Sequence, residues 1–174
     1  MIDHLTANPN GTSIAGRLEA GYRAGTWFGT AVIPYAALQA QNFHTNAYSE
    51  TDATGLNAFA LTYGAVNQSQ VRSELGSRFD FGAMMIGAAT LSWRARAAWA
   101  HDYSSAPSIG ATFQALPGAN FAVIGAQRAR DAALLSIGPE MSFGKGWSLH
   151  AKFDGEFAGN SQVYGGTGTL HYSW

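Results

Sequence analysis

The feature of the sequence that most constrains its fold is an alternation of non-polar and hydrophilic residues with period two. In residues 147–157 every odd position is non-polar and every even position is hydrophilic. The same split recurs, less strictly, at residues 14–24, 72–81 and 90–102. Because successive side chains of a β-strand point to opposite faces, this pattern predicts strands with one non-polar face and one charged face.

Strand length separates membrane barrels from soluble β-sandwiches. The alternating segments span about 11 to 16 residues, whereas sandwich strands usually have about 5 or 6. A tilted strand of roughly a dozen residues crosses the hydrocarbon layer of a membrane. Only 12% of the residues are charged, compared with about 25% in ordinary soluble domains. We therefore expect an all-β, antiparallel up-and-down transmembrane β-barrel with a non-polar face toward lipid and a charged, water-filled lumen.

Turn residues between the alternating segments predict nine strands, at residues 13–24, 27–40, 56–66, 71–81, 87–102, 109–116, 132–143, 147–157 and 163–174. An odd number cannot close an antiparallel barrel, so we expect a fragment, or a tenth strand at residues 1–10 or 121–126. Short connections are expected at 25–26, near Gln68, at 104–108 and at 144–146. Longer connections are expected at 41–55, 117–131, 82–86 and 158–162. Because such barrels have short periplasmic turns, this order places the carboxyl terminus on the periplasmic side.

Composition excludes other classes of function. The net charge is −1 and the basic residues are scattered, so there is no basic face for nucleic acid. The absence of cysteine excludes disulfides, thiolate zinc sites and thiol catalysis. The first residues lack the apolar core of a signal peptide, so we expect that a signal was removed or that the chain was cut from a longer one. The range 24–50 contains Gly25, Gly29 and Pro34 and favours strands over a transmembrane helix.

Five short motifs follow one another across nearly the whole chain. They are Gly16-Arg17-Leu18-Glu19-Ala20-Gly21-Tyr22, Pro34-Tyr35-Ala36-Ala37-Leu38-Gln39, Arg72-Ser73-Glu74-Leu75-Gly76-Ser77-Arg78, Pro117-Gly118-Ala119-Asn120-Phe121 with Arg130-Asp131-Ala132, and Leu170-His171-Tyr172-Ser173-Trp174. Together, in this order, they resemble the C-terminal translocator barrels of type V secreted autotransporters.

The resemblance implies a fold, a location and a set of partners. Autotransporter barrels have twelve strands preceded by a helix in the pore, so residues 1–12 would be a partial strand or linker and residues 13–174 the C-terminal portion of the barrel. The implied function is an outer-membrane translocator of a Gram-negative bacterium that anchors and exports an N-terminal passenger through a polar lumen. The implied partners are outer-membrane lipids, the β-barrel assembly machinery and the passenger. A fragment with open edges could also pair with a second copy, as a homo-oligomer.

Two other functions agree with the same pattern. One is a porin-like or structural outer-membrane barrel without a passenger, and the other is a soluble, lipocalin-like ligand-binding barrel. We expect no enzymatic activity, no cofactor and no dedicated metal site. Ser148, His150 and Asp154 share a face, but two-residue steps along a strand are about 6.6 Å apart and no nucleophile elbow occurs.

Candidate functional residues fall into three groups. The terminal strand carries alternating apolar and aromatic residues that resemble an outer-membrane assembly signal, or an ordinary interfacial aromatic girdle: Leu170, Tyr172 and Trp174. The lumen-facing candidates are the charged and histidine residues at hydrophilic positions: Arg17, Glu19, Arg23, Arg72, Glu74, Arg78, Asp80, Arg94, Arg96, Glu140, His150, Lys152, Asp154, Glu156 and His171. The lipid-facing girdle candidates are Tyr22, Phe79, Trp93, Trp99, Trp147, Phe153 and Phe157.

Turn lengths allow some cross-strand pairs to be predicted, because a hairpin turn fixes the register of its strands. If residues 143 and 147 pair, Glu140 faces His150; if residues 158 and 163 pair, His150 faces His171. We expect this row to be hydrogen-bonded, with a pH-sensitive contact or a zinc site as alternatives. Glu74 is expected to meet Arg94 or Arg96. Outward side chains at positions 59, 61 and 63 require an odd-length turn near Gln68.

Overall fold

A computed structural model describes residues 4–53, 55, 57–144 and 146–174. All elements in this part of the chain are β-strands, which confirms the predicted all-β class. No helix among these residues is long and apolar enough to cross a membrane. Some expectations fall partly outside the described residues: those for 1–10 and 1–12 include residues 1–3, that for 41–55 includes residue 54, that for 56–66 includes residue 56, and that for 144–146 includes residue 145.

The chain forms two compact units. Unit 1 comprises residues 1–16, 40–71 and 103–128, and unit 2 comprises residues 17–39, 72–102 and 129–174. The strands β2 (Gly11–Gly21), β4 (Thr30–Thr45) and β8 (Val66–Ile86) contribute residues to both units.

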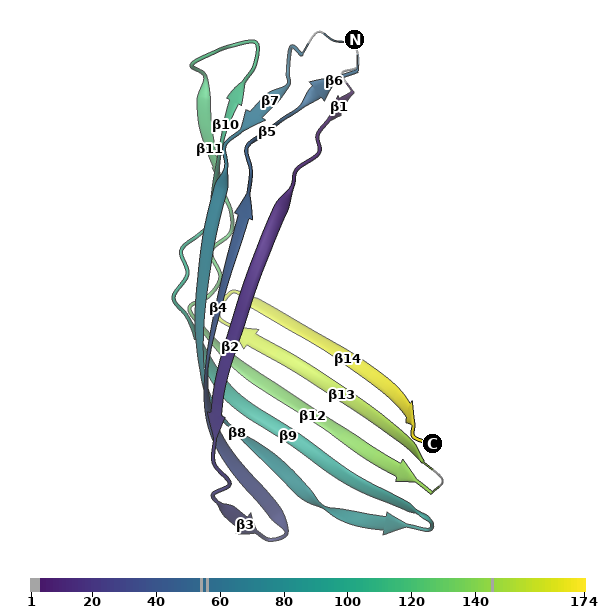
Figure 1. Cartoon of the computed structure of the whole chain (residues 1–174). Coiled ribbons are helices and arrows are strands. Elements are labelled where there is room, and N and C mark those ends of the chain that lie inside the picture. Colours follow the sequence, from purple (N-terminus) through teal and green to yellow (C-terminus); the bar gives the residue numbers. More distant parts are fainter. Residues whose placement is uncertain (1–3, 54, 56, 145) are drawn as a thin grey trace. The chain divides into compact units, whose positions relative to one another are not determined.

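Unit 2 is an antiparallel sheet in the order β14-β13-β12-β9-β8-β4-β2, with the short strand β3 (Gly25–Trp27) beside β4. Its other strands are β9 (Ala89–Asp102), β12 (Asp131–Phe143), β13 (Trp147–Ala158) and β14 (Ser161–Tyr172). Figure 1 shows β8, β9, β12, β13 and β14 side by side in chain order. The antiparallel up-and-down order agrees with the prediction, except that the expected strands 56–66 and 109–116 do not lie in this sheet: β8 pairs directly with β4, and β9 pairs directly with β12.

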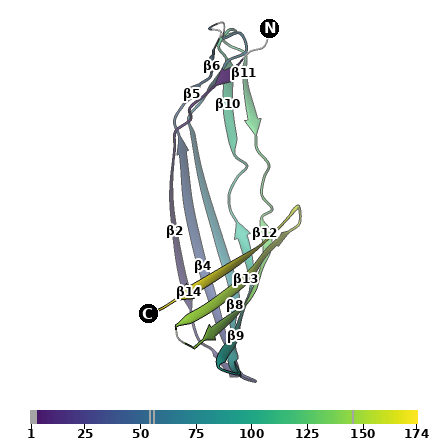
Figure 2. The same cartoon turned by 90° about the vertical axis from the view of Figure 1, so that its right-hand side faces the viewer.

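Unit 1 contains a second sheet that the sequence did not predict. Its order is β11-β10-β7-β5, formed by β5 (Tyr48–Ser49), β7 (Leu61–Tyr63), β10 (Ser108–Phe113) and β11 (Asn120–Ile124). A separate pair joins β1 (Leu5–Thr6) to β6 (Thr51–Asp52). The expected tenth strand at 121–126 therefore exists as β11, but it pairs with β10 in this sheet (Figure 2).

Glutamate and tyrosine side chains organise the sheet of unit 1. Tyr48 and Tyr63 stack with their ring centroids 4.7 Å apart. The Glu50 carboxylate accepts hydrogen bonds from the Leu61 backbone N–H at 3.0 Å and from the Tyr63 hydroxyl at 3.1 Å. Burial raises the pKa of the Tyr63 phenol, and its bond to Glu50 acts in the same direction.

Three of the connections predicted in the first half of the chain are wrong. β8 runs without a turn near Gln68, because polar residues there pair across strands instead of turning: the Asn42 amide donates to Asn67 at 2.9 Å and to Ser69 at 3.0 Å. The expected strand 56–66 is therefore replaced by short β7 and the start of β8, and the odd-length turn does not exist.

The other two errors misplace glycine-associated turns. Residues 82–86 belong to β8, which has a bulge between Phe81 and Met84, and the chain reverses only at Gly87, whose φ is 61°. The predicted turn at 25–26 lies in β3, and the reversal comes at Phe28 and Gly29, both with positive φ as a type I′ hairpin requires. Gly25 and Gly82 each signalled a nearby turn, but not its position.

The burial pattern is the inverse of that of a soluble domain. Among the described residues no large side chain is fully buried, and the buried non-polar residues are alanines together with Tyr35. Many large apolar side chains are exposed, such as Leu75 at 62% and Trp99 at 49%. Soluble monomers rarely leave so much contiguous apolar surface in water. The strands of unit 2 therefore present their apolar side chains outward.

Candidate functional site: the charged face of unit 2

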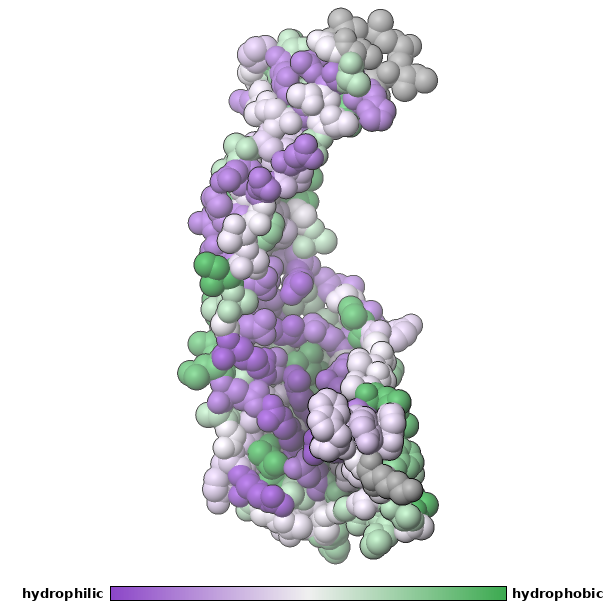
Figure 3. Space-filling view, turned by 45° about the vertical axis from the view of Figure 1, so that its right-hand side comes forward, coloured by the Kyte–Doolittle hydropathy of each residue, from purple (hydrophilic) through white to green (hydrophobic). Residues whose placement is uncertain are grey.

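One face of the unit 2 sheet gathers its charged side chains. Directly opposed residues include Arg78 with Arg96, and Asp80 with Arg94. We call this surface the charged face, and its members are Arg17, Glu19, Arg72, Glu74, Arg78, Asp80, Arg94, Arg96, Asp102, Glu140, His150, Lys152, Asp154 and Glu156. Figure 3 shows hydrophilic residues gathered over the hollowed part of unit 2, with hydrophobic residues at its margins.

Glu74 is the most enclosed member, with a side chain only 7% exposed. Arg17 binds it through two parallel hydrogen bonds, Nη1 to Oε1 and Nη2 to Oε2, both at 2.8 Å. Arg96 Nη2 donates to Oε2 at 2.9 Å, and the Tyr35 hydroxyl donates to the same oxygen at 3.4 Å. Charge-assisted, bidentate bonds of this kind are the strongest hydrogen bonds available to side chains. The expected contact of Glu74 with Arg94 or Arg96 is thus confirmed for Arg96.

The network continues from Glu74 to a second carboxylate. Arg17 also donates to Glu19 at 3.0 Å, and Glu19 in turn binds Arg78. The guanidinium groups of Arg78 and Arg96 lie 4.8 and 5.6 Å from the centre of the Tyr35 ring. Cations at such distances are attracted to the ring face.

A second cluster centres on Glu140. Arg94 Nη2 lies 3.0 Å from Glu140 Oε2 and its Nε lies 3.9 Å from Asp80 Oδ1. His150 is the direct cross-strand partner of Glu140, with Nε2 to Oε1 at 3.8 Å, so the predicted register of this hairpin is confirmed. Beside it, Lys152 Nζ lies 2.8 Å from Asp154 Oδ1.

The predicted pairing of His150 with His171 is wrong. Ala158 pairs with Ser161 across a two-residue turn, not with Val163, and this slides β14 by two positions. His150 therefore faces Thr169, and His171 faces Ser148. The described residues contain no group of three or more His, Asp or Glu side chains placed to hold a metal ion.

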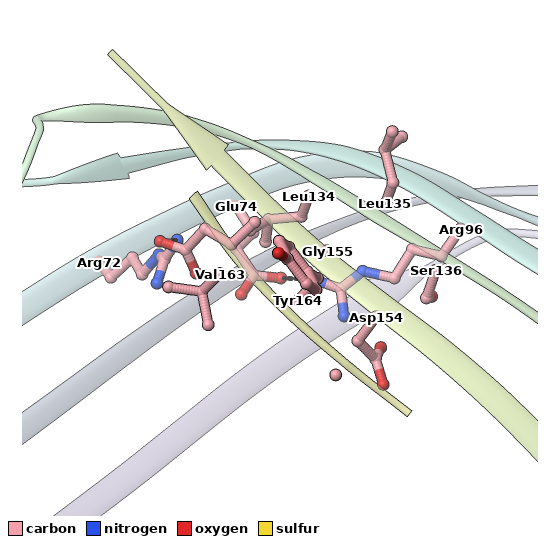
Figure 4. Close-up of a pocket in the computed structure, with 12 residues that line it drawn as sticks. Arg72, Glu74, Arg96, Leu134, Leu135, Ser136, Asp154, Gly155, Val163 and Tyr164 are labelled. Atoms are coloured by element: carbon pink, nitrogen blue, oxygen red, sulfur yellow. Dashed lines mark hydrogen bonds and ion pairs between the residues drawn. The ribbon is translucent and has the colours of Figure 1, made fainter. Parts of the chain in front are cut away.

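The Arg72–Glu156 ion pair shows that the sheet curls toward the charged face. Arg72 Nη2 lies 2.9 Å from Glu156 Oε1, although β9 and β12 separate their strands. Three strand spacings amount to roughly 14 Å on a flat sheet, which is longer than these two side chains reach comfortably. On this face lies an open pocket of about 440 Å³ (Figure 4), lined in part by Arg72, Glu74, Arg96, Leu134, Ser136, Asp154 and Glu156.

The opposite face of the same strands is apolar. Cross-strand partners there include Leu75 with Trp99, Phe81 with Trp93, and Trp147 with Tyr172. By strand alternation the girdle candidates on β8, β9 and β13 lie on this face: Phe79, Trp93, Trp99, Trp147, Phe153 and Phe157. Five two-residue steps from Trp147 to Phe157 cover about 33 Å, or about 25 Å in height at a 40° tilt, which matches the apolar band of outer-membrane barrels.

Tyr22 and Arg23 lie just past the end of β2. The Tyr22 backbone N–H still bonds the Pro34 carbonyl at 3.0 Å, so the chain continues alongside β4 here.

The sequence pattern did not identify two sets of residues. Tyr35 lies on β4, which carries no charge, so alternation there left the inward face undefined. On the apolar face, Asp131 Oδ1 accepts hydrogen bonds from the Trp99 indole at 3.1 Å and lies 2.8 Å from His101 Nδ1. The sequence did contain a signal for the His101–Asp131 pair. Trp99 and His101 both occupy odd positions, as the other apolar-face residues of this strand do.

The terminal strand continues the apolar face to one end of the sheet. Leu170 faces Leu149 and Tyr172 faces Trp147, whose ring centroid is 4.6 Å away. Trp174 follows the end of β14, with its ring 6.4 Å from that of Tyr172. β14 is paired only with β13, so its other edge is open in the described sheet.

Comparison with known protein families agrees with this geometry. The family model described as "Autotransporter beta-domain" matches residues 1–154. No curated protein matches the chain. The match covers all strands of unit 2 except β14 and the end of β13. The chain belongs to the autotransporter β-domain family, the outer-membrane translocator domains of Gram-negative bacteria.

Proposed function

We propose that this chain lines the export path of a passenger that precedes it in the same polypeptide, with the charged face as the wall of the lumen. The observation that carries the proposal is the pairing of two unlike faces on the same strands, one ion-paired and one apolar and exposed. An unfolded segment moving past the charged face would keep its backbone groups solvated, which lipid would forbid. The apolar face would meet outer-membrane lipid.

The terminal strand supplies the proposed contact with the assembly machinery. Leu170, Tyr172 and Trp174 alternate along an open sheet edge, where a partner could add a strand through backbone hydrogen bonds. The open edges of β14 and β2 could alternatively join a second copy, because unpaired edges are costly in lipid. We propose no chemical reaction for the chain, since the domain family serves transport.

The test is surface display of a segment fused before residue 1, carrying a short epitope and expressed in a Gram-negative host. We expect antibodies to reach the epitope on intact cells, and external protease to remove it. A chain that fractionates with the outer membrane while its epitope stays in the periplasm would overturn export and favour a porin-like barrel. Recovery of the folded chain without detergent would instead favour the soluble barrel.

A further inference from the structure

A polar cluster interrupts the apolar face of unit 2 near one end of its strands. The Trp99 indole donates a hydrogen bond to Asp131 Oδ1 at 3.1 Å, and His101 Nδ1 lies 2.8 Å from the same oxygen. The Trp99 and His101 rings have their centroids 5.6 Å apart. Because an ionised carboxylate only accepts hydrogen bonds, the imidazole Nδ1–H is the donor of the second bond. We call these three residues the rim cluster.

The register places the rim cluster where the apolar face ends. Trp99 pairs with Ala133, and Ala133 pairs on its other side with Phe157. One two-residue step further along the strands, His101 pairs with Asp131. Along the described strands β8, β9, β12, β13 and β14 of unit 2, these two are the only charged or histidine residues at outward positions. An aromatic row followed directly by a polar row is typical of a membrane–water interface.

The Asp131 carboxylate can accept a further bond at this position. Its side chain is 60% exposed. Both bonds within the rim cluster end on Oδ1, so the second oxygen, Oδ2, is not needed to hold the cluster together. A carboxylate binds most strongly to cations that also carry N–H donors. Asp131 therefore suits a positively charged partner with N–H groups.

Arg130 adds the opposite charge at the same end of the strand. It directly precedes β12 and is exposed, and its charge attracts that of Asp131. A guanidinium matches the geometry of phosphate oxygens and binds them through paired hydrogen bonds. Neighbouring Arg130 and Asp131 thus complement a group that carries a phosphate and an ammonium together.

We propose that the rim cluster and Arg130 bind the headgroup of a lipid that carries a phosphate and a primary ammonium. The ammonium contacts Asp131, the phosphate contacts Arg130, and Trp99 and His101 hold the carboxylate in place. The occupant is a lipid because the site continues directly into the exposed apolar face, where Trp99 is 49% exposed. The inference rests on the proposed contact of that face with lipid.

The test measures urea unfolding in vesicles of phosphatidylcholine, with and without an equal part of phosphatidylethanolamine. Both headgroups carry a phosphate and a positive charge, but only phosphatidylethanolamine has N–H donors. We expect phosphatidylethanolamine to raise the ratio of folded to unfolded chain about fivefold more for the parent than for Asp131→Asn, the upper limit for an exposed ion pair. Equal gains in the parent and in Asp131→Asn would overturn the inference.

Asp154→Asn is the matched control, because it makes the same exchange at an exposed ion pair on the charged face. It should gain from phosphatidylethanolamine as much as the parent does. Loss of the gain in this variant as well would show that the effect does not arise at Asp131, and would also overturn the inference.

A second measurement needs no variant. Stepwise N-methylation of phosphatidylethanolamine should remove the parent's gain progressively, and a gain that survives full methylation would contradict the proposed ammonium contact. Free phosphoethanolamine added to the chain in a neutral detergent should give no gain, and an equal gain there would contradict a lipid occupant. Failure of brominated acyl chains to quench tryptophan fluorescence would instead contradict the proposed contact of the apolar face with lipid.

Discussion

At the scale of single residues, Glu74 holds the charged face together. Replacing it by glutamine removes the charge that Arg17 and Arg96 share, while keeping the shape of the side chain. We expect Glu74→Gln to lower the free energy of unfolding by about 3 kcal/mol, because breaking an enclosed ion pair leaves its partners uncompensated. Urea titration of the chain folded in detergent, followed by tryptophan fluorescence, measures the change.

The matched control is Asp154→Asn. Its ion pair with Lys152 is similarly short, at 2.8 Å, but both side chains are about half exposed. Exposed pairs contribute about 0–1 kcal/mol, so this variant should unfold almost as the parent does. Equal effects of the two substitutions would show that enclosure of Glu74 adds nothing to its pairing.

Alternation alone was sufficient to predict which of these residues share a face, and it foresaw the Glu74–Arg96 contact. It could not identify Tyr35, whose position on an uncharged strand gives no contrast between the two faces. It also missed the His101–Asp131 pair, since polar residues on an apolar face contradict the pattern from which the face was inferred.

At the scale of elements, the β12–β13 ladder is interrupted at Gly138 and Pro139. Paired residues stop at Ile137 opposite Phe153 and resume at Glu140 opposite His150. A Cβ at position 138 would overlap the Ala151 carbonyl oxygen and lie 3.0 Å from the Lys152 Cα. We expect Gly138→Ala to destabilise the folded chain by about 1–3 kcal/mol, the usual cost of overpacking, measured by the same urea titration.

Gly168→Ala provides the comparison for this strand. Gly168 faces Ala151 from the other side, on β14, and a Cβ there would meet nothing within 4 Å. The substitution should leave stability unchanged or slightly improved, since alanine restricts the unfolded chain more than glycine does. A loss at position 168 as large as that at 138 would contradict the steric explanation.

The register between β13 and β14 is testable by crosslinking, because the chain has no native cysteine. We expect cysteines at positions 150 and 169 to form a disulfide readily, since these residues are direct partners. Cysteines at 150 and 171 should not, because a two-residue offset places their Cα atoms about 8 Å apart, beyond disulfide reach. Mobility on non-reducing gels distinguishes the two variants, and the opposite outcome would restore the register expected from sequence.

The sequence pattern predicted the wrong β13–β14 register for a physical reason. Slides of two residues keep every side chain on its own face, so the alternation pattern is identical in both registers. Only the turn decides between them, and residues 158–162 contain small and polar residues that suit a loop of either length. The same ambiguity explains why the turns predicted at residues 25–26 and 82–86 differ in position from the observed turns.

At the scale of the whole molecule, the odd number of strands in the unit 2 sheet constrains how a barrel can close. Its sheet follows seven antiparallel strands from β2 to β14, so the two edge strands run in the same direction. Antiparallel closure between them therefore takes an odd number of additional strands. The twelve strands implied by the family resemblance leave five, which satisfies this requirement. The sequence pattern predicted an odd number of strands, but not that strands β5, β7, β10 and β11 form a sheet of their own.

The apolar face gives the sharpest test of how unit 2 meets a membrane. Ile137 lies near the middle of this face on β12, is 48% exposed and pairs with Phe153 and Ala95. We expect Ile137→Arg to lower stability in phospholipid vesicles by about 2–4 kcal/mol, and Ala133→Arg, near the end of the strand, by only about 0–1 kcal/mol. Urea unfolding in vesicles measures both changes.

The neighbouring Ser136 supplies a control with the same added charge on the other face. Ser136 faces Arg96 and Asp154, so an arginine at that position would enter a polar surface with a carboxylate nearby. Its cost should be small in vesicles and in detergent alike. A penalty at position 136 equal to that at 137 would mean that both faces meet the same surroundings, and the division of unit 2 into a lipid side and a water side would then be wrong.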